Sequence, residues 1–180
     1  MTILAIETSC DETAISILEF KSSTWTPDVQ VEGRVLSHLV SSQVEMHKEW
    51  GGVVPNIAKR EHQKTLIPLL KQGLVESGLI TPPTPRLRRA GKSQARNNKQ
   101  TPNSKIEILN EILDREPELL IQAKDFLPTI EVPGIDAIAV THGPGLEPAL
   151  WVGVNFAKDL STVWQKPLIP INHLEGHLVS

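Results

Sequence analysis

Apolar residues recur along this chain with two different spacings, and each change of spacing marks where strands give way to helices. Residues 3–6 form a nearly continuous apolar run, which is typical of a strand buried on both faces. Apolar and polar residues then alternate over residues 14–20, so this segment is expected to return beside the first strand as a hairpin. A third strand is predicted over residues 29–40, with a bulge at Gly33.

The spacing becomes helical after the glycine pair at residues 51–52. Apolar residues about one helical turn apart predict a helix over residues 56–77, kinked or split at Pro68. The elements predicted beyond this helix are, in chain order, a helix opened by a capping box at Ser104, a strand over 135–140, a helix over 148–164, a strand over 168–171 and a helix that begins at His173 behind an Asn172 cap.

The order is three strands followed by helix, strand, helix, strand, helix. The first three strands form an antiparallel meander, and helical crossovers then add parallel strands through right-handed connections. The sequence therefore predicts an α/β fold with a mixed sheet. This is also the order of elements in a lobe of the actin, Hsp70 and sugar-kinase group, although fold alone does not define function.

Composition divides the chain at residues 81–104. This stretch holds six cations, four prolines, no acid and one large aliphatic residue, Leu87, so it is predicted to be a disordered basic insertion. Contact with an RNA backbone and a simple solvated loop are both compatible with it. Residues 1–80 and 105–180 would then form one lobe around the insertion.

The cellular compartment is suggested by features that the sequence does not contain. Cys10 is the only cysteine, so an internal disulfide and a cysteine-based zinc pattern are both excluded. The N-terminus lacks the pattern of a signal peptide, and no apolar run approaches the ~18 residues of a membrane span. We expect a cytoplasmic protein without a membrane partner.

His173 and His177 are the sharpest candidates for chemistry. At positions i and i+4 they share one helix face, where two imidazoles can bind a single metal ion. Glu175 points away from that face, so the zinc-protease arrangement is absent. Two surface histidines without a ligand are the alternative interpretation.

A second candidate is the loop that joins the first two predicted strands. Ser9, Asp11 and Glu12 lie there among other hydroxyls and backbone donors, an arrangement that can hold phosphate. The two carboxylates would repel a bare phosphate, so a bridging cation or a positioned water would be required. An ordinary polar turn explains the same residues.

Several short segments together form a specific pattern: residues 4–13, 41–43, 51–55, Arg60, His62, Thr141, 143–146, 152–153, 158–164, Pro167 and 173–178. Taken together they resemble the catalytic subunit family of tRNA threonylcarbamoyladenosine synthase, formerly called O-sialoglycoprotease. The resemblance covers residues 1 to about 80 and 133 to 180, which correspond to the N-terminal half of the family only. Asp159 departs from the pattern, because a small residue is usual there.

The resemblance implies a two-lobed, actin-like ATPase-type fold of which this chain holds the first lobe. It implies an acyltransferase that moves threonylcarbamoyl from threonylcarbamoyl-AMP to the adenosine beside a tRNA anticodon. It also implies one iron or zinc ion held by His173 and His177, with a third ligand from an acid in the second lobe. No catalytic residue is assigned.

The resemblance further implies three partners: tRNA, a homologous actin-like scaffold subunit and an ATPase subunit. Because residue 180 precedes the second lobe, we predict that the chain alone is inactive. A non-catalytic scaffold subunit of the same tRNA-modification complex is the alternative, although relatives of that subunit lack the paired histidines. The two hypotheses differ in whether metal is bound.

Overall fold

A mixed five-stranded sheet organises the chain, with strands in the order β3-β2-β1-β4-β5. The structure is a computed structural model, and it describes residues 1–21, 32–81 and 102–179. In chain order the strands are β1 Thr2–Glu7, β2 Glu12–Phe20, β3 Gly33–Ser42, β4 Ala137–Gly143 and β5 Leu168–Asn172.

Strand pairing confirms the predicted meander and crossovers. β2 runs antiparallel to both β1 and β3, whereas β4 runs parallel to β1 and β5 runs parallel to β4. The bulge predicted at Gly33 is wrong, because Gly33 pairs in register with Phe20 and the shift lies between Ile17 and Leu18. Gly33 instead makes room for the Phe20 ring, since a Cβ there would lie 2.9 Å from Phe20 Cε1.

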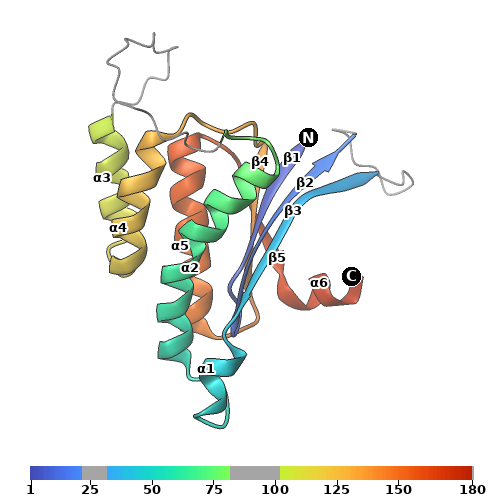
Figure 1. Ribbon diagram of the computed structural model, residues 1–180, viewed down its shortest axis with the longest axis vertical. Coiled ribbons are helices and arrows are strands. Elements are labelled where there is room, and N and C mark those ends of the chain that lie inside the picture. The colour runs from blue at the N-terminus through green and yellow to red at the C-terminus, as the bar shows by residue number, and fades with distance from the viewer. Residues whose placement is uncertain (22–31, 82–101, 180) are drawn as a thin grey trace.

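Most helices cover one face of this sheet (Figure 1). α2 and α5 pack directly on the strands, and α3 and α4 pack outside them. The short α6 contacts β4 and β5 and lies on the other side of the sheet. The helices are α1 Val44–Lys48, α2 Pro55–Glu76, α3 Pro102–Ile112, α4 Pro117–Phe126, a 3-10 turn Leu127–Thr129, α5 Glu147–Trp164 and α6 His173–Val179.

Three expectations about the helices change. α2 continues through Pro68 as one helix, so it is not split. α3 begins at Pro102, before the capping box expected at Ser104, and residues 102–104 therefore belong to a helix rather than to the basic insertion. α4 was not predicted, although its proline start and helically spaced apolar residues are visible in the sequence. Residues 82–101 of that insertion lie outside the described residues.

The core lies between the sheet and the α2–α5 layer. Leu4 of β1 and Ile15 of β2 are fully buried there, against Leu66 of α2 and Phe156 of α5. Burying each such side chain contributes about 1.5–3 kcal/mol. Because side chains alternate along a strand, Glu7 points to the opposite face of the sheet from Leu4, the face on which α6 lies. None of the helices in the described segments is long and apolar enough to cross a membrane.

Candidate functional site

α6 carries both candidate histidines and starts where the sequence predicts. Asn172 caps the helix, and its Oδ1 accepts hydrogen bonds from the backbone N–H groups of Leu174 at 2.9 Å and Glu175 at 3.3 Å. The cap fixes the first turn of the helix, so His173 leaves the sheet edge in a defined direction.

The two imidazoles turn toward each other. His173 Nε2 lies 3.1 Å from His177 Nε2, and the two rings are perpendicular. A metal bound to two imidazole nitrogens at ~2.0–2.1 Å needs those nitrogens roughly 2.9–3.4 Å apart, for bond angles of about 90–110°. The pair therefore fits one metal ion as a two-nitrogen donor set. Within residues 1–21, 32–81 and 102–179, no third His, Cys, Asp or Glu completes the cluster.

Residues at the end of β1 lie beside His173 Nδ1, the ring nitrogen that does not face His177. Ser9 Oγ lies 3.2 Å from His173 Nδ1, and Glu7 Oε2 lies 3.7 Å from the same nitrogen. The backbone N–H of Ser9 donates to Glu7 Oε1 at 2.5 Å. Glu7 was not among the predicted site residues, although its place at the end of a buried strand could have drawn attention to it.

The other two residues predicted in this loop are Asp11 and Glu12, at the start of β2. Glu12 opens β2 with an exposed side chain, and Asp11 is partly exposed beside it. In the described part of the chain, no hydrogen bond or ion pair joins either carboxylate to His173. Their predicted role near a phosphate therefore stays a prediction, whereas Ser9 is placed at the pair.

α5 holds the loop at Thr8. The Thr8 hydroxyl donates to the Ala149 carbonyl at 3.0 Å and is fully buried. A Cβ on Gly153 would lie only 2.3 Å from Thr8 Oγ1. Glycine at this helical position is explained by the closeness of the hairpin loop.

The segment before α5 holds the loop at Ser9. The backbone N–H of Leu146 donates to the Ser9 carbonyl at 2.7 Å. A Cβ on Gly145 would lie 2.6 Å from that same carbonyl oxygen, so any larger residue would displace one of the two backbones. The glycine loop before α5 thus packs against the hairpin.

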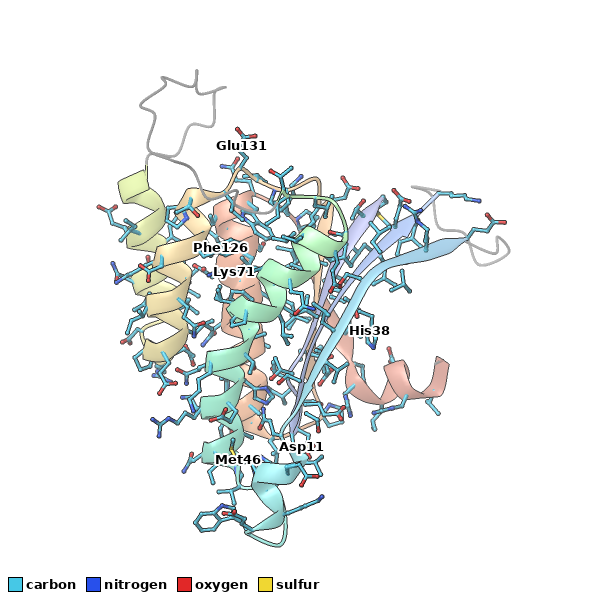
Figure 2. All side chains as sticks on the ribbon, in the orientation of Figure 1. Asp11, His38, Met46, Lys71, Phe126 and Glu131 are labelled. Carbon is cyan, nitrogen blue, oxygen red and sulfur yellow. The ribbon has the colours of Figure 1, made fainter. Side chains whose placement is uncertain are left out.

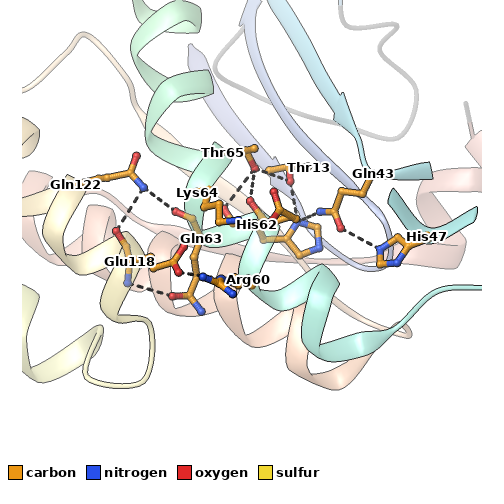
Figure 3. Close-up of polar contacts among 11 residues, drawn as sticks. Thr13, Gln43, His47, Arg60, His62, Gln63, Lys64, Thr65, Glu118 and Gln122 are labelled. Atoms are coloured by element: carbon orange, nitrogen blue, oxygen red, sulfur yellow. Dashed lines mark hydrogen bonds and ion pairs between the residues drawn. The ribbon is translucent and has the colours of Figure 1, made fainter. Parts of the chain in front are cut away.

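Buried histidines take part in the hydrogen bonds that hold residues 10–13 of the hairpin loop (Figure 3). His62 is fully buried, and burial lowers the pKa of its imidazole despite nearby carboxylates. The neutral ring donates from Nε2 to the Cys10 carbonyl at 3.1 Å and accepts at Nδ1 from the Thr13 hydroxyl at 2.7 Å. His62 is therefore structural, because its ring nitrogens bond to the loop.

Gln43 extends this network. Its side-chain amide lies 3.3 Å from His62 Nδ1 and 3.3 Å from His47 Nε2 (Figure 3). Its backbone N–H donates to the Asp11 carbonyl at 2.8 Å. Contacts from α1, α2 and α5 therefore fix the hairpin loop that faces the histidine pair.

The Cys10 thiol is expected to react slowly as a nucleophile, and its alkylation rate tests this expectation. Burial raises the pKa of its thiol, and the hydrogen bond and charge of Asp11 raise it further. Since the thiolate is the reactive form, we expect iodoacetamide at pH 8 to alkylate the folded chain more slowly than the urea-unfolded chain. Asp11→Asn should increase the folded-state rate. Equal rates for folded and unfolded wild-type protein would contradict this assignment.

An antiparallel meander and helical crossovers to parallel strands define an α/β protein with a mixed five-stranded sheet, and a capped helix at its edge carries the paired histidines. The sequence profile of the TsaD family, described as tRNA N6-adenosine threonylcarbamoyltransferase, matches residues 34–82 and 119–180. The chain therefore belongs to the TsaD family. The profile leaves out the basic insertion and α3, as the resemblance did.

Individual relatives carry the same name as the family profile. The chain is 37% identical over 179 residues to a tRNA N6-adenosine threonylcarbamoyltransferase of Thermomicrobium roseum, covering 99% of this chain and 32% of that protein. It is 34% identical over 178 residues to the protein of the same name from Persephonella marina, covering 99% of this chain and 34% of that protein. The chain thus spans about a third of the length of these curated relatives.

Among solved structures, YeaZ from Pseudomonas aeruginosa aligns with this chain, and the alignment covers 96% of this chain and 45% of the YeaZ chain. Its TM-score is 0.42 and its sequence identity is 13%. This similarity is too low to support a conclusion about the chain.

Proposed function

We propose that this chain supplies the first lobe of a tRNA N6-adenosine threonylcarbamoyltransferase. The observation that carries the proposal is the 3.1 Å approach of His173 Nε2 to His177 Nε2, in a chain of the TsaD family. The whole protein would transfer the threonylcarbamoyl group of threonylcarbamoyl-AMP to the adenosine next to the anticodon of tRNA. Its setting would be cytoplasmic, with a scaffold subunit and an ATPase subunit as further partners.

Each part of the proposed site has a defined task. His173 and His177 would hold one iron or zinc ion, which when bound supplies Lewis-acid chemistry toward the carbonyl of the adenylate. The hairpin loop is fixed by contacts from α1, α2 and α5. It keeps Ser9 and Glu7 beside the ring of His173. Because two imidazoles leave most of a coordination shell open, a further ligand from a second lobe is required. We therefore expect the chain alone to be inactive.

The test is threonylcarbamoyl transfer to tRNA, with the part of a curated relative that this chain does not span supplied in trans. We expect His173→Ala and His177→Ala each to lower the rate at least ~100-fold, because each removes one of the two nitrogens from the metal site. His38→Ala is the matched control, since that exposed histidine bonds to Ser16 rather than to the pair. Metal content is measured on the same samples.

Two outcomes would count against the proposal. Full activity of both histidine variants would make the metal assignment wrong. A complete assembly that retains no tight metal and transfers nothing would instead support the alternative, a non-catalytic scaffold subunit of the same complex.

A further inference from the structure

We infer that Glu7 is a positioning residue, which acts with Ser9 to hold His173 in the tautomer that carries its proton on Nδ1. The inference rests on the proposed metal site, because it concerns which ring nitrogen of His173 is open to a ligand. It assigns a role to a carboxylate 166 positions away in the sequence. Neither Asp11 nor Glu12, the carboxylates predicted for this loop, has that role.

The two ring nitrogens of His173 face different groups. Its Nε2 faces His177 Nε2 at 3.1 Å, and its Nδ1 faces Ser9 Oγ at 3.2 Å with Glu7 Oε2 behind at 3.7 Å. A neutral imidazole has one N–H and one lone pair. Whichever nitrogen carries the proton therefore decides whether the metal side of the ring can act as a ligand.

The environment of Nδ1 favours an N–H at that nitrogen. Ser9 Oγ can accept its hydrogen bond, and the negative charge of Glu7 attracts the positive end of the N–H dipole. The metal side then has a lone pair on Nε2, which in the metal-free protein accepts a hydrogen bond from His177 Nε2–H. In many proteins a carboxylate that accepts the N–H of the outer nitrogen fixes the tautomer of a metal-binding histidine and raises its basicity as a ligand.

The fold keeps Glu7 in place for this task. The other carboxylate oxygen, Oε1, accepts the Ser9 backbone N–H at 2.5 Å, which orients the carboxylate. Ser9 itself is held by the Leu146 N–H, at 2.7 Å from its carbonyl. The side chains of Glu7 and His173 are 33% and 28% exposed, so bulk water weakens their interaction less than it would weaken that of an open surface pair.

Glu7→Gln is the informative substitution. The amide oxygen can still accept from the Ser9 N–H, so the loop should remain folded. The NH₂ group then faces His173 Nδ1 as a donor, which favours a lone pair at Nδ1 and the proton at Nε2. Unlike a general loss of structure, this change would move the proton between two defined atoms.

The tautomer is read directly from the ring ¹⁵N shifts of His173 by NMR, on the full metal-free chain at pH 8. We expect the Nδ1–H form in the wild-type chain and a shift toward the Nε2–H form in Glu7→Gln. Titration with Zn²⁺ alone, followed on the ring resonances of both histidines, should show 10–100-fold weaker binding to the variant. Ser9→Ala should change both measurements in the same direction.

Glu131→Gln is the control. Figure 2 shows Glu131 at the opposite end of the molecule from Asp11 and the hairpin loop, so it should change neither measurement. A wild-type His173 protonated on Nε2 would overturn the inference. So would an unchanged tautomer and Zn²⁺ affinity in Glu7→Gln.

The same experiment separates the two proposals. If Zn²⁺ leaves both histidines of the wild-type chain unperturbed, the metal site of the proposed function fails. If Zn²⁺ binds the pair but Glu7→Gln has no effect, only the role of Glu7 fails.

Discussion

Asp159→Ala is expected to stabilise the protein, by about 2–4 kcal/mol at pH 8. Asp159 lies on α5 and is fully buried. In the described part of the chain neither of its carboxylate oxygens has a hydrogen-bond partner. Alanine removes that buried polar group, and a small residue is what the family resemblance leads us to expect at this position.

The stabilisation should depend on pH with a defined sign. Burial raises the pKa of Asp159 from 3.8 to about 7, so the folded chain favours the protonated acid. The contribution of this group to stability is fully present below pH 3.8 and is lost as pH rises through about 7. The total loss is on the order of 4 kcal/mol, because one pKa unit corresponds to about 1.4 kcal/mol.

Urea unfolding of the wild type and the variant at pH 5 and pH 8 measures this effect. The wild type should lose about 2–3 kcal/mol more than Asp159→Ala between the two pH values. Asp159→Asn is the control, because it keeps the shape and a buried polar group but cannot ionise. It should remove the pH dependence without giving the full stabilisation. Parallel pH profiles for the wild type and Asp159→Ala would contradict the burial of an ionisable group.

The second large effect is expected at Gly153, where alanine should destabilise the protein by about 3 kcal/mol. The added Cβ would lie 2.3 Å from Thr8 Oγ1, closer than any relaxed contact. Thr8 is held by its hydrogen bond to the Ala149 carbonyl, so the hairpin loop and α5 must move apart. Because Ser9 follows in the same loop, Zn²⁺ binding by the histidine pair should also weaken.

Gly73→Ala is a matched control. Gly73 is also a buried glycine in a helix, but its added Cβ would come no closer than 3.6 Å to Ser37 Oγ. We expect Gly73→Ala to be neutral or to stabilise by about 1 kcal/mol, since alanine is the better helix former. If urea unfolding shows equal effects for the two substitutions, the contact between α5 and the loop does not explain Gly153.

A double-mutant cycle locates the effect. Thr8→Ala alone should cost about 1 kcal/mol for its lost hydrogen bond. Combined with Gly153→Ala, it removes the closest atom of the clash, so the double variant should be more stable than Gly153→Ala alone. A double variant that only adds the two single losses would mean that Thr8 is not the obstacle.

Local pattern was sufficient for most of the secondary structure. The change from alternating to helical spacing located every strand and the long helices α2 and α5 to within a few residues, because each element must present one face to a common core. It failed where the cause lies in another element. The Gly33 bulge was wrong because the glycine accommodates the Phe20 ring across the ladder, and nothing local to Gly33 shows that contact.

By itself, the sequence determined the histidine pair and its cap. A spacing of four residues places His173 and His177 on one helix face, and Asn172 is next to the helix it caps, so both relations are local. Tertiary structure alone decided what surrounds the pair. Glu7 at the end of β1 reaches His173 of α6, and Gly153 of α5 makes room for Thr8, because these elements meet in space although they are far apart along the chain. Packing of distant elements likewise decided that Asp159 is buried with no hydrogen-bond partner among residues 1–21, 32–81 and 102–179, which no property of the residue itself would indicate.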